Sequence, residues 1–192
     1  MKYRITSARR LIAVAAAAVA GLGISSAAAY AATSTPTVPA AAVIPACTAG
    51  SLGAWVAVDQ GNGAAGTIYY PLEFTNISGH ACSLYGYPGV SAISRTGSQL
   101  GSPAGWGSLS GAKRVILAPG ATAHTILAYH DAAVTTSPGC HPVNTTFKLN
   151  VIPPGQRSST DAAFDLEACS RTGVIYMNII EPIRAGVGTI NG

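Results

Sequence analysis

The chain has 192 residues, of which 48% are hydrophobic and only 9% are charged. Its formal net charge of +4 arises in the first ten residues, which contain four basic and no acidic side chains. The rest of the chain is formally neutral, so the basic pI of about 9.0 gives no reason to expect binding to nucleic acid or to an anionic membrane.

The N-terminus has the three parts of a secretory signal peptide. The basic first ten residues precede an uncharged apolar run, residues 11–24, and small residues then offer a cleavage site between Ala29 and Ala31. The apolar run is short for a membrane-spanning helix, which needs about 20 residues. We therefore expect residues 1–31 to be removed on export, leaving a secreted or cell-envelope protein that does not span the membrane.

Two segments follow the predicted leader. Residues 32–46 are rich in Thr, Pro and Ala and show no apolar period, which predicts an extended linker. Residues 47–192 have the length of one domain and are numerous enough to bury a hydrophobic core. We therefore expect a leader, a linker and a single folded domain.

The first two predicted strands of this domain are residues 54–59 and 67–75. In the first strand we expect Val56 and Val58 to face inward. The second strand alternates apolar and polar side chains, which places its apolar residues on one face of a sheet. Pro71 interrupts this strand and lacks an N–H group, so it requires a sheet edge or a bulge.

Turn residues surround the next strand. Asn, Ser and Gly at residues 76–81 predict a polar turn that leads directly to Cys82. Residues 89–95 predict a third strand, and residues 95–98 predict a hairpin turn back toward Leu100.

The middle of the domain predicts a loop and a hairpin. Residues 101–111 form a Gly/Ser-rich loop that contains Trp106. Residues 113–118 are apolar and β-branched, and residues 118–121 have Pro and Gly at the central positions of a type II turn. We expect residues 122–130 to return as the partner of the strand before the turn.

The last part predicts three further strands. Residues 146–152 alternate, a short strand surrounds Phe164 and Leu166, and residues 173–181 are apolar on both faces, as in a central strand. No helix is predicted after the leader. Short strands with frequent turns favour an all-β domain, an immunoglobulin-like β-sandwich of about seven to nine strands.

All four cysteines, Cys47, Cys82, Cys140 and Cys169, lie in the predicted domain. An even number in an oxidising compartment predicts two disulfides, and four cysteines permit three pairings. We favour Cys47–Cys82 and Cys140–Cys169, because each closes a loop of about 30–35 residues, worth roughly 3–4 kcal/mol in the chain-entropy relation. A zinc site is disfavoured because the cysteines lack the close spacing that places two thiolates on one metal.

Several motifs resemble a known family. They are Phe74-Thr-Asn-Ile-Ser-Gly, Cys82-Ser-Leu-Tyr-Gly-Tyr-Pro-Gly89 and Leu117-Ala-Pro-Gly-Ala121, followed by Cys140 and Cys169. Together they resemble the secreted actinobacterial family of domains of unknown function numbered 4232, over about residues 47–183. The resemblance implies export or an envelope location and a β-sandwich with paired cysteines. It implies no activity, because the family has none assigned.

No catalytic, cofactor-binding or metal-binding residues are predicted. The domain has no G-x-S-x-G motif, and His130 and Asp131 are sequence neighbours whose side chains point apart in a strand. His124 and His130 share a strand face, but six residues separate them by roughly 20 Å, too far to bind one ion. We therefore expect a protein that is not an enzyme and that needs no cofactor.

Aromatic side chains are the candidates for ligand contact. The chief candidates are Trp106, Tyr85 and Tyr87, together with Trp55 and Tyr69, because an exposed ring could stack on a sugar or anchor a protein. The alternative is structural, with Trp55 filling the edge of the core and Trp106 fixing its Gly-rich loop.

The leading hypothesis is therefore a secreted, non-enzymatic module that binds an extracellular protein or a glycan, and no nucleic acid. One alternative is a carbohydrate-binding module that uses the exposed aromatic residues. Another is a secreted protease inhibitor that presents residues 101–111 or 131–144 as its exposed loop.

Overall fold

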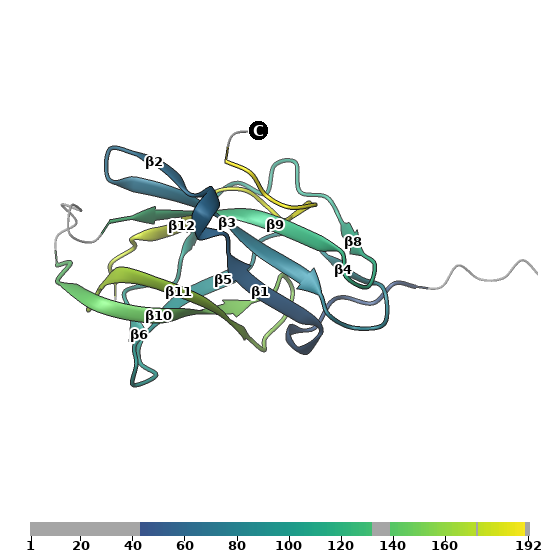
Figure 1. Ribbon diagram of the computed structural model, residues 1–192, viewed down its shortest axis with the longest axis horizontal. Coiled ribbons are helices and arrows are strands. Elements are labelled where there is room, and N and C mark those ends of the chain that lie inside the picture. Colours follow the sequence, from purple (N-terminus) through teal and green to yellow (C-terminus); the bar gives the residue numbers. More distant parts are fainter. Residues whose placement is uncertain (1–42, 132–138, 172, 191–192) are drawn as a thin grey trace, which may run out of the picture. The chain divides into compact units, whose positions relative to one another are not determined.

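The computed structural model describes residues 43–131, 139–171 and 173–190 (Figure 1). The predicted leader, residues 1–31, and most of the predicted linker lie outside the described residues. The described part is all-β apart from two short 3-10 turns, η1 (Ala49–Ser51) and η2 (Val58–Gln60). Within it, no helix is long and apolar enough to cross a membrane.

The described strands form three sheets. The largest has seven strands in the order β1-β3-β9-β12-β7, with β2 beside β3 and β13 beside β9. Its members are β1 (Leu52–Val56), β2 (Asn62–Ala64), β3 (Thr67–Asn76), β7 (Gly105–Trp106), β9 (Thr122–His130), β12 (Met177–Ile179) and β13 (Arg184–Ala185). The second sheet has the order β11-β10-β5-β6, and the third pairs β4 with β8. Their members are β4 (Cys82–Leu84), β5 (Gly89–Ile93), β6 (Gln99–Leu100), β8 (Val115–Leu117), β10 (Pro142–Ile152) and β11 (Thr160–Cys169).

One hydrophobic core lies between the sheets. It contains Leu72 and Phe74 from β3, Leu149 from β10 and Leu117 from β8, each at most 1% exposed. In Figure 1, β3, β9 and β12 lie in the upper layer and β5, β10 and β11 in the lower one. Because each strand turns alternate side chains inward, both layers supply the same core. The prediction of an all-β, sandwich-like domain is confirmed.

Two disulfides join Cys47 to Cys82 and Cys140 to Cys169, which is the pairing that the sequence favours. The first links the segment before η1 to β4. The second links Cys140, two residues before β10, to the end of β11, where Pro142 and Cys169 are in register. Each bond therefore ties together segments that are neighbours in the folded domain.

The predicted pairing of residues 113–118 with residues 122–130 is wrong. The turn between them does form, since the N–H of Ala121 donates to the carbonyl of Ala118 at 3.0 Å. However, the turn also exchanges backbone hydrogen bonds with Asn76, which directs the following strand onto β3. As a result, β8 pairs with β4, whereas β9 pairs with β3 and β12.

The prediction that Val58 faces inward is also wrong. Strand β1 ends at Val56, and Val58 lies in η2 with 59% of its surface exposed. Pro71 of β3 accepts a hydrogen bond from the N–H of Ala57 but has no N–H to return. The ladder therefore stops there, and Pro71 lies between the stretches of β3 that pair with β1 and with β2.

Thirteen strands are described, more than the seven to nine expected. Several contain only two or three residues, too few to produce an alternating pattern in the sequence. The loop predicted at residues 101–111 thus includes β7. Conversely, the strand expected over residues 173–181 is reduced to Met177–Ile179, and Ile175 and Ile180 on either side are 54% and 47% exposed.

Candidate functional site

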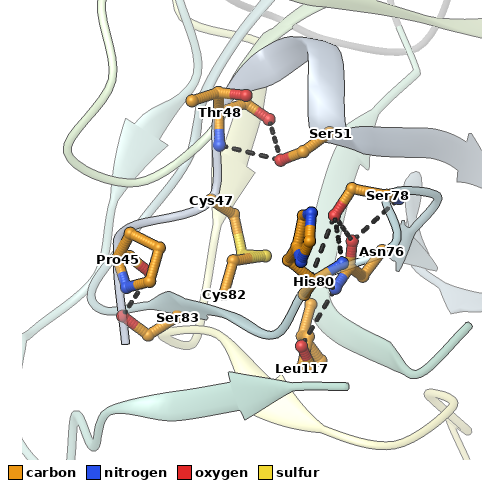
Figure 2. Close-up of a disulfide and its surroundings, with 10 residues drawn as sticks. All are labelled: Pro45, Cys47, Thr48, Ser51, Asn76, Ser78, His80, Cys82, Ser83 and Leu117. Atoms are coloured by element: carbon orange, nitrogen blue, oxygen red, sulfur yellow. Dashed lines mark hydrogen bonds between the residues drawn. A yellow bond between two sulfur atoms is a disulfide. The ribbon is translucent and has the colours of Figure 1, made fainter. Parts of the chain in front are cut away.

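The polar turn after β3 is organised by the buried side chain of Asn76 (Figure 2). Its Nδ2 donates to the carbonyls of His80 and Leu117 at 2.8 and 3.0 Å. Its Oδ1 accepts from the N–H and the hydroxyl of Ser78 at 3.0 and 2.7 Å. Because the amide has two donors and two acceptor sites, all of its hydrogen-bonding capacity is used within the fold. None is left for a ligand.

The disulfide beside this turn also stabilises the fold, because it joins two segments that are held together by backbone hydrogen bonds. The N–H of Cys47 donates to the carbonyl of Ser83, and the N–H of Ser83 donates to the carbonyl of Pro45 (2.9 and 2.8 Å). Figure 2 shows the Cys47–Cys82 bond between these two segments. The segment before η1 is thereby held against β4 by backbone hydrogen bonds and by the covalent link.

The structure gives each histidine of β9 its own partners. Asn178 donates through Nδ2 to Nε2 of His130 at 3.1 Å, and Nδ1 of His130 lies 2.8 Å from the hydroxyl of Thr67. His124 Nδ1 lies 2.8 Å from the carbonyl of Gly186. No serine contacts either ring in these hydrogen bonds. Within the described residues, no three His, Cys, Asp or Glu side chains are grouped so as to hold a metal ion.

A buried carboxylate lies on the outer face of the largest sheet. Glu73 of β3 is in register with Trp55 on one side and with His124 on the other, yet only 1% of it is exposed. The N–H of Gly188 donates to its Oε1 at 2.8 Å, so the C-terminal segment covers it. Burial raises the pKa of Glu73, an effect that the Gly188 N–H and His124 partly oppose. Sequence reasoning missed this burial, since the pattern places Glu73 on the polar face of its strand.

Five exposed apolar side chains lie on β7 or on stretches that neighbour it, and we call this set the Trp106 surface. Its members, 47–63% exposed, are Tyr85, Trp106, Leu109, Ile175 and Ile180. Trp106 is in register with Ile179 of β12, the neighbour of Ile180, and Ile175 lies beside Gly105. Leu109 lies beside Gly86, the neighbour of Tyr85. The topology thus assembles this surface from three separate stretches of the chain.

The ring of Trp106 is held in place although 63% of it is exposed. It stacks on Tyr87 with ring centroids 6.2 Å apart and an interplanar angle of 14°. Its indole N–H donates to the carbonyl of Pro88 at 2.9 Å. Trp106 therefore both fixes its loop and offers an immobilised aromatic surface, combining the two roles that the sequence leaves as alternatives.

The two tyrosines among the chief aromatic candidates differ in accessibility. Tyr85 is 57% exposed, whereas Tyr87 is only 7% exposed and donates its hydroxyl to the carbonyl of Ser108 at 2.6 Å. Tyr87 therefore offers little surface for direct contact with a ligand. The ring of Tyr87 lies beneath Trp106, so Tyr87 would influence a ligand by holding the ring of Trp106 in position.

A separate hollow of about 460 Å³ lies beside the β2–β3 hairpin. Apart from Asp131, its described lining has no charged side chain, and it includes Gly61, Gly63 and Gly66. We see no arrangement in it that selects a ligand.

Comparison with known proteins identifies the chain at the level of the family. Residues 47–175 match the profile of the domain of unknown function DUF4232. The chain belongs to this family. The DUF4232 match includes all four cysteines, the turn around Asn76 and most of the Trp106 surface, and it ends before the C-terminal segment that covers Glu73. No curated protein and no solved structure matches the chain.

Proposed function

We propose that this DUF4232 protein is an exported, non-enzymatic binding module that holds a protein partner through the Trp106 surface. The observation that carries the proposal is a tryptophan that stays exposed although Tyr87 and Pro88 hold its ring in place. A large apolar ring in water costs free energy that burial against a partner recovers. Since Trp106 is already fixed, binding costs little of its side-chain entropy.

The composition of this surface favours a protein over other ligands. Tryptophan and tyrosine are enriched among the residues that dominate protein–protein binding energy, usually inside a rim of weaker contacts. The other members of the set, Leu109, Ile175 and Ile180, are aliphatic and are also exposed. Aliphatic neighbours suit the apolar side chains of a protein better than the hydroxyl-covered ring of a sugar.

Export is supported by the predicted leader and by two disulfides, because such bonds persist in oxidising compartments. The non-enzymatic part of the proposal is supported by the partners of the titratable side chains. His130 is held by Thr67 and Asn178, and neither of these partners is a carboxylate that would orient the imidazole as a general base.

Carbohydrate binding is the second candidate, and one observation favours it. The indole N–H of Trp106 is satisfied by Pro88, so the ring offers mainly its apolar surface, on which a sugar ring can stack. Protease inhibition gains no such support. The backbone of residues 101–111 is partly used in pairing with β12, and residues 132–138 of the other loop lie outside the described residues.

The test measures retention of the purified exported protein on intact cells that produce it, for the wild type, Trp106→Ala and Trp55→Ala. Trp55 is a matched control because it is also partly exposed, at 41%, and lies on β1. We expect Trp106→Ala to reduce retention at least about tenfold and Trp55→Ala to leave it unchanged.

Two further arms separate the candidate ligands. Protease treatment of the cells should abolish retention if the partner is a protein. Retention on insoluble cellulose, chitin or peptidoglycan that depends on Trp106 would instead support the carbohydrate reading. Equal retention of wild type and Trp106→Ala in every arm would refute both.

A further inference from the structure

A second, smaller cavity lies between β8 and β13 and is distinct from the residues of the Trp106 surface. Its volume is about 270 Å³. The two strands belong to different sheets, since β8 pairs with β4 and β13 pairs with β9. The cavity is therefore formed by the edges of two sheets that meet without pairing across it.

Positive charge is concentrated at this cavity. Of the seven Lys and Arg residues that follow the first ten residues of the chain, Lys113, Arg114 and Arg184 line it, and none of its described lining residues is acidic. Glu181 engages Arg184, with Oε2 2.6 Å from Nε. The side chains of Lys113 and Arg114 are exposed and form no such ion pair among the described contacts. In a domain that is formally neutral, this is a local excess of positive charge.

Apolar side chains form the rest of the wall. Val115 and Ile183 are buried at 6% and 2% exposure, and Ile116 is 55% exposed. Cations alone would attract any anion, whereas cations beside an aliphatic wall favour an anion carried on an apolar group. The volume falls just below the roughly 300–1,000 Å³ of sites for drug-sized ligands, so a small molecule fits better than a large one.

We propose that this cavity binds a small amphipathic anion, namely a carboxylate carried on a short apolar chain. The carboxylate pairs with Arg114 and Lys113, because a guanidinium and an ammonium give charge-assisted hydrogen bonds to its two oxygens. The apolar chain lies against Val115, Ile116 and Ile183. This site does not depend on the proposed partner of the Trp106 surface.

The probe is hexanoate, titrated into the full exported chain while the methyl resonances of the isoleucines are followed by NMR. We expect saturable shifts at Ile116 and Ile183 with a Kd on the order of 1 mM, and at least about tenfold weaker binding of hexanol, which lacks the charge, and of inorganic phosphate, which lacks the apolar chain. Added salt should weaken hexanoate binding, because the cations are exposed.

A charge-removal series sharpens the test. The double variant Lys113→Gln and Arg114→Gln should weaken hexanoate binding at least about tenfold, whereas Arg157→Gln, an exposed cation in the turn between β10 and β11, should leave it unchanged. The comparison of hexanoate with hexanol and phosphate uses the wild-type protein alone. It therefore tests the proposed site even if the double variant folds poorly. Hexanoate binding that is absent, matched by either control probe, or unaffected in a folded double variant would overturn the proposal.

Discussion

The turn around Asn76 and the Trp106 surface lie in the same domain but use their side chains in opposite ways. In the turn, a fully buried amide makes four hydrogen bonds inside the protein. On the Trp106 surface, large apolar side chains remain exposed. The turn lies within the residues that match the DUF4232 family, yet the side-chain amide of Asn76 has no hydrogen-bonding capacity left for a ligand. A specific motif can therefore indicate how a family folds without indicating what it binds.

The first way to test this contrast is to remove the disulfide beside the turn. Replacing Cys47 and Cys82 with serine should lower the free energy of unfolding by about 3–4 kcal/mol, because the unfolded chain regains the entropy of a long loop. Urea unfolding at neutral pH measures this directly. A loss below about 1 kcal/mol would show that the bond contributes little to the stability of this end of the domain.

Asn76→Ala should have the next largest effect on stability. The substitution leaves the carbonyl of Leu117 and the N–H of Ser78 without their partners, at a cost of about 2–3 kcal/mol. Ser78→Ala is the matched control, since it removes only a hydroxyl in the same turn and should cost about 1 kcal/mol or less. If the two variants unfold at the same urea concentration, Asn76 does not organise the turn.

Glu73→Gln should change the pH dependence of the free energy of unfolding, by about 1 kcal/mol between acidic and neutral pH. Burial raises the pKa of Glu73, so the folded state favours the protonated carboxyl. Wild-type stability should therefore fall, relative to the variant, as pH rises through that raised pKa, and the two proteins should converge as pH falls below the ordinary value of 4.5. Glutamine keeps an oxygen that can accept the N–H of Gly188.

The measurement for Glu73 is thermal unfolding from pH 4 to pH 8, with Glu167→Gln on β11 as the control. Two results would contradict the buried carboxylate described above. One is a difference in Tm between wild type and Glu73→Gln that stays constant over this pH range. The other is a higher Tm for the wild type at neutral pH.

Trp106→Ala should have the smallest effect on stability. The ring loses its stacking on Tyr87 and one hydrogen bond to Pro88, together worth at most about 1 kcal/mol at an exposed site. Urea unfolding should place this variant close to the wild type, in contrast to Asn76→Ala. A loss of 3 kcal/mol would indicate that Trp106 is mainly a structural residue.

Local sequence patterns were sufficient to predict much of the fold. The alternation over residues 67–75 identifies β3 and its inward face, because side-chain direction in a strand depends only on position. The favoured cysteine pairing, which closes the two shorter loops, is confirmed. The partner of β8 could not be predicted in this way, since it depends on the docking of the turn after β8 onto Asn76, a contact between distant parts of the sequence.

The candidate sites were less predictable, for the same reason. Trp106 stands out in the sequence by residue type, but the burial of Tyr87 and the exposure of Ile180 follow from how β7, β12 and the turn after β4 meet. Likewise, Arg114 and Arg184 are far apart in the chain and become neighbours only because β8 and β13 line one cavity. Glu73 is covered by Gly188, whose contact no local pattern reveals.

The most direct test of the account measures stability and retention on producing cells side by side for Asn76→Ala, Trp106→Ala and Trp55→Ala. We predict that folded Asn76→Ala retains wild-type binding despite a lower free energy of unfolding, and that Trp106→Ala keeps its stability while losing at least about tenfold in retention. Two results would contradict the separation of a folding motif from a binding surface. One is loss of retention in an Asn76→Ala variant that is folded under the conditions of the assay. The other is unchanged retention in Trp106→Ala.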